Sequence, residues 1–169
     1  QMFISYKSEY RSFAQIIRDF LQNIGYKPWL DVDKILGGDN FRAKIEAALE
    51  ESDIILGIIT PEAVMSEEVL AELDFAFSNK KRLLLILHKK SKVPYWLRRI
   101  QYIDFTNDEQ IGFEKLKTAL SETDTTDYSG VSPSAEYARL TAPKPQFTPS
   151  VQPQSVSKSP NQQDDEQDR

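Results

Sequence analysis

Two polar segments of this chain carry groups suited to binding a sugar or a phosphate. Tyr6, Lys7 and Ser8 follow an apolar run and offer an aromatic ring, a cation and a hydroxyl group. Gly37 and Gly38 lie in a second polar stretch, where the backbone could approach a ligand closely. Each segment also has a structural interpretation, because Ser8 could cap the first helix and the two glycines could form an ordinary turn.

Three carboxylates form the other group that could do chemistry. Glu67, Glu68 and Glu72 lie early on an expected helix, and the spacing of four residues places Glu68 and Glu72 on one helical face. The alternative is a solvated helix surface that the dipole at the helix N-terminus stabilises.

Several other kinds of site are excluded or disfavoured. The chain has no cysteine, which excludes disulfides and thiolate metal sites, and its single histidine, His88, disfavours a histidine-based zinc or iron site. Neither of the two Gly-rich phosphate-binding motifs, G-x-G-x-x-G and G-x-x-x-x-G-K-S/T, occurs in the sequence. Asp53 stands at the start of its strand, which is the wrong end of the sheet for an aspartate that accepts a phosphoryl group, so we exclude that role. We interpret His88 as a strand-end residue and not as a catalytic one. We therefore expect no metal and no bound cofactor.

The elements that must position these residues alternate between strand and helix about five times. Short apolar runs predict strands over residues 2–6, 27–30, 54–59, 82–87 and 101–105. Apolar periodicity predicts helices over 10–24, from Asp39 or Asn40 through Leu49, from 60–62 to about 79, and over 108–120. A short helix or turn is expected over 94–99, and Gly25 should end the first helix.

The central strands indicate the fold class. Residues 54–59 and 82–87 are too apolar to face water, which is typical of parallel strands covered on both faces. Pro28 indicates an edge strand, where a missing N–H does least harm. Right-handed crossovers then favour an α/β fold, a flavodoxin-like three-layer sandwich of about five parallel strands flanked by helices. The polar segments above would meet at the carboxyl ends of these strands, where such folds bind ligands.

Composition divides the chain near residue 120. Residues 121–169 hold six of the nine prolines and a net charge of −4, and they are rich in Ser, Thr, Pro and Gln. Such a segment cannot bury enough apolar surface to offset its ordering entropy. We expect a folded domain over 1–120 and a disordered acidic linker or tail over 121–169. Because the chain begins at Gln1 inside an expected strand, we also expect it to be a piece of a longer protein.

The same composition bears on partners and location. The folded part carries a net charge of only −1, which argues against nucleic acid as a partner. No apolar run approaches the ~18–20 residues that span a bilayer, and the N-terminus has no signal-peptide pattern. We expect a cytoplasmic protein with no membrane partner.

Four stretches have an order and a spacing typical of one known family. They are Phe3-Ile4-Ser5-Tyr6, the passage from Trp29-Leu30-Asp31 through Gly37-Gly38, the stretch from Ala48 to Thr60, and Ser66 followed six residues later by Glu72-Leu73. Together they resemble a Toll/interleukin-receptor (TIR) domain of the bacterial type. The resemblance covers residues 2 to about 120.

The resemblance implies an enzyme that cleaves NAD into nicotinamide and either ADP-ribose or a cyclic isomer, in bacterial immune (antiviral) or cell-death signalling. It maps the catalytic glutamate of the family onto Glu72. It also implies activation by self-association through TIR–TIR contacts, and a sensor domain elsewhere in the full-length chain. The substrate-binding positions that it implies are Ser5, Tyr6, Lys7, Leu36, Gly37, Ser66 and Glu68.

The chemistry of NAD cleavage is compatible with so sparse a site. The pyridinium leaves as neutral nicotinamide, so one carboxylate could hold the ribose hydroxyls and stabilise an oxocarbenium-like transition state without a general acid. Many active members of the family carry a tryptophan four residues before the glutamate, where this chain has Glu68. A second carboxylate there is expected to weaken diphosphate binding unless it points away.

Two other functions stay open from the sequence. The first is a non-catalytic TIR scaffold for homotypic protein–protein interaction, which Glu68 in place of the aromatic favours. The second is a small flavin- or nucleotide-sensing domain.

Overall fold

The computed structural model describes residues 1–30, 39–100 and 102–122, and only the backbone of residues 39–41. The strands are β1 (Met2–Ser5), β2 (Pro28–Trp29), β3 (Ile54–Ile59), β4 (Arg82–Leu87) and β5 (Tyr102–Asp104). The α-helices are α1 (Arg11–Asn23), α2 (Asp39–Glu51), α3 (Glu67–Ser78) and α4 (Glu109–Ser121). Short 3-10 helices are η1 (Ser8–Tyr10), η3 (Ala63–Met65) and η4 (Tyr95–Arg99).

Several predictions from the sequence fall outside the described residues. They concern the expected tail beyond residue 122, the loop positions Leu36 and Gly37, and the side chains of Asp39 and Asn40, one of which was expected to cap α2.

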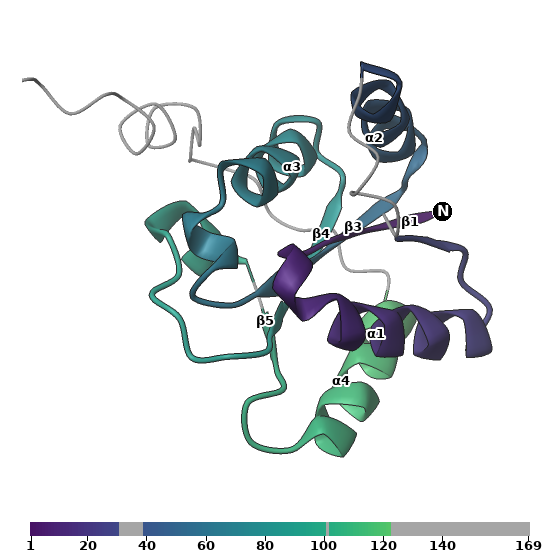
Figure 1. Cartoon of the computed structure of the whole chain (residues 1–169). Helices are drawn as coiled ribbons and strands as arrows, with labels where there is room; N and C mark the ends of the chain where they lie inside the picture. The colour runs from purple at the N-terminus through teal and green to yellow at the C-terminus, as the bar shows by residue number, and fades with distance from the viewer. Residues whose placement is uncertain (31–38, 101, 123–169) are drawn as a thin grey trace, which may run out of the picture.

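The five strands form one parallel sheet in the order β2-β1-β3-β4-β5. This order and the helices on both faces confirm the predicted flavodoxin-like α/β sandwich (Figure 1). β2, which contains Pro28, lies at one edge of the sheet, as the proline predicted. The central position of β3 and the inner position of β4 explain why both strands are apolar on both faces.

Two hydrophobic clusters join the sheet to its helical layers. α2 and α3 lie over one face together with η4, and α1 and α4 lie over the other (Figure 1). Side chains of β1 alternate between the two clusters: Phe3 belongs to the α2–α3 layer, while Met2 and Ile4 belong to the α1–α4 layer. The next residue, Ser5, therefore faces α3.

The start of α1 differs from the prediction. Ser8 opens the separate 3-10 turn η1, and its hydroxyl donates to the carboxylate of Glu9 at 3.1 Å. α1 begins only at Arg11, after Tyr10, which makes no side-chain capping bond. The structural interpretation of Ser8 as the cap of this helix is therefore wrong, because an extra turn separates it from α1.

The end of α1 agrees with the prediction. Gly25 adopts a left-handed conformation with φ of 94°. Its N–H donates to the carbonyl of Gln22 at 3.0 Å, and the N–H of Tyr26 donates to Leu21 at 3.0 Å. These two bonds form a Schellman motif, which ends the helix at the expected glycine.

The helix expected to open around Thr60 begins later than predicted. The Thr60 hydroxyl accepts a hydrogen bond from the N–H of Ala63 at 3.1 Å and so closes the turn that leads into η3. α3 then begins at Glu67. The proline at position 61 therefore stands before a 3-10 turn, and the long helix starts one turn further on.

Candidate functional site

A buried carboxylate lies on the inner side of α3, at the carboxyl end of β1. The side chain of Glu72 is only 8% exposed, and Ser5 is 1% exposed. The Ser5 hydroxyl donates to Oε2 of Glu72 at 2.6 Å, which is the length of a charge-assisted O–H···O⁻ bond. Two residues 67 positions apart in the sequence are therefore directly bonded, at the sheet edge where such folds bind ligands.

The local sequence of α3 explains why this carboxylate points inward. Val69, Leu73 and Ala76 recur at helical spacing and are buried against the sheet. Glu72 lies three residues after Val69 and four residues before Ala76, so it shares the helical face that these two residues bury against the sheet. On β1, the alternation that sends Phe3 toward α3 sends Ser5 the same way.

The N-terminal turn of α3 holds two further predicted site residues. Ser66, 8% exposed, occupies the N-cap position without a side-chain capping bond, and its carbonyl accepts from the N–H of Leu70 at 3.0 Å. Glu68 lies in the first turn of the same helix and is exposed, in contrast to the buried Glu72 one turn later. Ser66 and Glu68 are thus brought near Glu72 by one helix, and only Glu68 is open to solvent.

The segment after β1 divides between the two faces of the sheet. Tyr6 is 1% exposed and packs into the α1–α4 cluster. Its ring therefore packs in the layer on the other face of the sheet from the layer that holds Glu72. Lys7, the next residue, is half-buried and stands at the start of η1, directly beyond the strand end.

A second polar group lies beyond the end of β4. The ring of His88 stacks on Phe13 with 3.7 Å between centroids and meets Tyr10 edge to face at 5.6 Å. The Tyr10 hydroxyl donates to Oε2 of Glu62 at 2.6 Å, and the ammonium of Lys89 lies 4.8 Å from the Tyr10 ring centroid. His88 follows the last residue of β4, in agreement with its interpretation as a strand-end residue.

The burial of His88 predicts a dependence of stability on pH. Burial lowers the pKa of the imidazole below 6.5, against the opposing effect of Glu109 and with a smaller lowering by Lys89. The unfolded chain therefore binds a proton more readily than the folded chain, and stability falls as the pH drops through about 6.5. We expect His88→Phe, which keeps an aromatic ring beside Phe13, to make this fall shallower. Denaturant unfolding at pH 5, 6 and 7 measures the free energy of unfolding of the wild type and of His88→Phe. An equal fall of this free energy in the two proteins would contradict the prediction.

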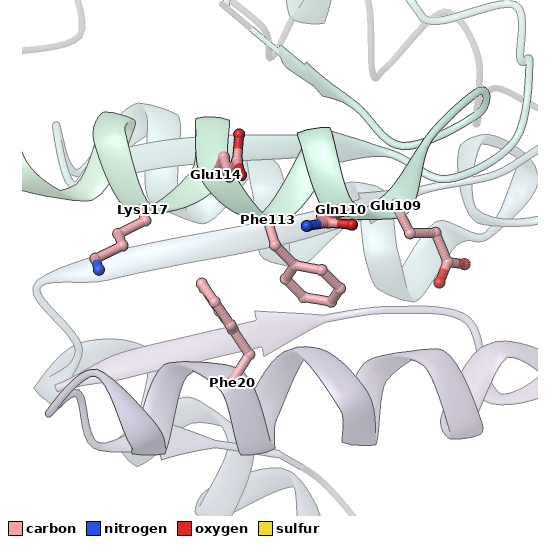
Figure 2. Close-up of a pocket in the computed structure, with 6 residues that line it drawn as sticks. All are labelled: Phe20, Glu109, Gln110, Phe113, Glu114 and Lys117. Carbon is pink, nitrogen blue, oxygen red and sulfur yellow. The ribbon is translucent and has the colours of Figure 1, made fainter.

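A pocket of about 490 Å³ lies between α1 and α4, on the opposite face of the sheet from Glu72. Phe20 of α1 and Phe113 of α4 point toward each other in it, with 4.7 Å between ring centroids (Figure 2). The remaining lining residues all come from α4: Glu109, Gln110, Glu114 and Lys117. Among the described residues, Ser5, Tyr6, Lys7, Ser66, Glu68 and Glu72 do not line this pocket.

The described residues contain neither a cluster of metal ligands nor a membrane-spanning helix. Among them, no group of three or more His, Asp or Glu side chains is arranged to hold a metal ion. None of the helices described is long and apolar enough to cross a bilayer.

One residue beside the site was not singled out from the sequence. Gly57 of β3 pairs with Ser5 of β1 in the parallel register. A glycine inside a buried apolar strand is itself a signal of close approach by another element, because any other residue there would contribute a packed side chain. The approaching element in this protein is α3, through Leu73.

Comparison with known proteins agrees with this architecture. A family model described as TIR domain matches residues 2–117. The TIR domain of the Toll-related receptor TRR-2 from Hydra magnipapillata superposes with a TM-score of 0.62 at 20% identity, over 72% of this chain and 98% of that one. The Clostridium botulinum CMP N-glycosidase BcmB superposes with a TM-score of 0.50 at 19% identity, over 70% of this chain and 99% of that one. No curated protein matches the sequence.

Proposed function

Because this chain belongs to the TIR domain family, we propose that it is an enzyme that cleaves the N-glycosidic bond of NAD. The products would be nicotinamide and either ADP-ribose or a cyclic isomer. The observation that carries the proposal is the buried Glu72 carboxylate, which Ser5 holds by a 2.6 Å hydrogen bond at the carboxyl end of β1.

The carboxylate of Glu72 has the charge and the fixed position that this reaction needs. The bond to nicotinamide breaks with positive charge developing on the ribose, and a preorganised negative group beside it stabilises that charge. Burial strengthens this effect, because electrostatic interactions are stronger at low dielectric. The leaving group departs neutral, so no second carboxylate has to protonate it. Ser5 supplies the hydrogen bond that fixes the direction of the carboxylate.

The remaining site residues would bind the rest of the substrate. Lys7, half-buried just beyond β1, is the cation proposed to meet the diphosphate. Leu36 and Gly37 are proposed to contact the nucleotide, together with Ser66 at the start of α3. We further propose activation by self-association, a sensor domain elsewhere in the full-length chain, and a role in bacterial immune or cell-death signalling in the cytoplasm.

The direct test is an assay for released nicotinamide at rising protein concentration. Activity that climbs more steeply than the protein concentration would support cleavage by an assembled form. CMP should be assayed in parallel, since a solved structure with a similar fold is named a CMP N-glycosidase. Release of cytosine without release of nicotinamide would keep the N-glycosidase proposal and replace its substrate.

Removing the hydrogen bond to Glu72 should slow the reaction without preventing substrate binding. We expect Ser5→Ala to lower kcat by about 10- to 100-fold with little change in KM, because a misdirected catalytic group costs rate rather than affinity. Ser8→Ala is the matched control, since that hydroxyl donates to the exposed carboxylate of Glu9 at 3.1 Å and lies outside the Ser5–Glu72 pair. Equal kcat values for the two variants would contradict the role given to Ser5.

A non-catalytic TIR scaffold is the second candidate, and Glu68 favours it. This exposed carboxylate stands where many active members of the family carry a tryptophan, and it lies one turn from Glu72. To distinguish the scaffold from the enzyme, self-association is measured by sedimentation at rising protein concentration in the presence of NAD, and the NAD that remains intact is measured in the same samples. Self-association with all of the NAD intact would make the scaffold the better description.

A further inference from the structure

We infer that Gly57 is a positioning residue for Glu72, because its lack of a side chain lets α3 lie close enough to the sheet for Ser5 to reach the carboxylate. The inference rests on the function proposed for Glu72 and adds to it a residue that touches neither the substrate nor the carboxylate.

The first observation is the space above Gly57. A Cβ atom added to Gly57 would lie 2.7 Å from Cδ2 of Leu73 and 3.0 Å from Cδ2 of Leu85. The 2.7 Å contact is too short for two carbon atoms and the 3.0 Å contact is tight, so a side chain at position 57 requires Leu73 to move. Both leucines are buried, with Leu73 0% and Leu85 1% exposed, and close packing leaves them little room to do so.

The second observation is that this contact lies beside the Ser5–Glu72 hydrogen bond. Ser5 and Gly57 are partners in neighbouring strands. Glu72 and Leu73 are consecutive residues of α3. One pair joins β1 to α3 through a hydrogen bond of 2.6 Å, and the other joins β3 to α3 through direct packing on a glycine. If α3 moves away from the sheet at Leu73, Glu72 therefore moves with it.

The length of the hydrogen bond makes the site sensitive to such a change. The Ser5–Glu72 bond is 2.6 Å long, so a shift of α3 by about 0.5 Å away from the sheet would lengthen it beyond the ordinary O–H···O range of about 2.5–3.0 Å. A displacement of about 1 Å in a catalytic group can cost about 100-fold in rate. Gly57 thus acts on catalysis through the position of α3.

The experiment compares Gly57→Ala with Gly112→Ala. A Cβ atom at Gly112 of α4 would lie 2.7 Å from the ring of Phe105, an equally short contact in the opposite layer. We expect Gly57→Ala to lower kcat for NAD by about 10- to 100-fold with KM little changed, and Gly112→Ala to leave kcat within about threefold. Thermal unfolding of both variants sets an assay temperature at which each remains folded.

A compensating substitution and a crystal structure complete the test. Leu73→Val removes the methyl groups nearest to position 57, so Gly57→Ala/Leu73→Val should recover most of the lost activity. If Gly57→Ala does not give folded protein, restored folding and activity in the double variant support the inference, and a double variant that also fails contradicts it. In a crystal structure of Gly57→Ala, the Ser5–Glu72 distance should exceed 3 Å.

The outcomes separate the two proposals. A Ser5–Glu72 distance that stays near 2.6 Å in Gly57→Ala overturns the positioning role, whatever the activity. A lengthened distance in a protein whose wild type releases no nicotinamide supports the positioning role and overturns the proposed function.

Discussion

Replacing Glu72 by glutamine is expected to reduce nicotinamide release by about 100- to 1000-fold or more, to the background of the assay. Glutamine has nearly the same shape, and its amide oxygen can still accept the hydrogen bond from Ser5. The variant therefore keeps the packing of α3 and removes only the negative charge that would stabilise the ribosyl cation. Initial rates with NAD, measured by chromatography of nicotinamide, give the effect on kcat.

Glu68→Gln is the matched control for this prediction. It removes the same charge from the same helix, one turn earlier and at an exposed position. We expect it to retain at least wild-type kcat, because a carboxylate at position 68 would oppose a bound diphosphate rather than assist cleavage. Equal loss in the two variants, or none in either, would rule out the assignment of Glu72 as the catalytic residue.

The largest loss of stability is expected for Trp96→Ala. Trp96 is fully buried in the α2–α3 layer and meets the ring of Phe77 edge to face at 6.0 Å. Its indole N–H has no hydrogen-bond partner among the described residues, so the substitution removes packing and leaves no polar group unpaired. We expect the free energy of unfolding to fall by about 3–5 kcal/mol, a large fraction of the stability of a domain of this size. Chemical denaturation measures the difference.

The neighbouring residue provides the comparison. Tyr95 belongs to the same 3-10 helix, and it is 62% exposed. Tyr95→Ala should change the free energy of unfolding by less than about 0.5 kcal/mol. If the two alanine variants lost similar amounts, the destabilisation would arise from the backbone of η4 rather than from the buried indole ring.

The sequence predicted the fold because its strands and helices have strong and different apolar patterns. The continuous apolar runs at 54–59 and 82–87 could only be inner strands, and both are. Gly25 ended its helix as expected, since few other residues adopt a φ of 94°. The starts of α1 and α3 were placed less well, because a single 3-10 turn before a helix leaves almost no trace in apolar periodicity.

The residues of the candidate site could be named from the sequence, but the orientation of their side chains was not predicted. The resemblance to TIR domains named both Ser5 and Glu72, and the structure places them in direct contact. It also named Tyr6, which points into the other layer. The alternation of side chains along a strand already separates neighbours such as Ser5 and Tyr6, so that information was in the sequence. The glycine within the apolar strand 54–59 signals that another element approaches it closely, but the sequence does not say that this element is α3 or that the contact is made by Leu73.

The outer strand β2 has a consequence for how copies of this protein can assemble. The strand is two residues long, and the N–H of Met2 donates to Lys27, so the next residue, Pro28, has its nitrogen on the side away from β1. A proline there offers no donor to an incoming chain, and growth of the sheet by intermolecular strand addition is blocked at this border. On the β2 side of the sheet, homotypic contacts would therefore be made by helices and loops, since a strand cannot be added there.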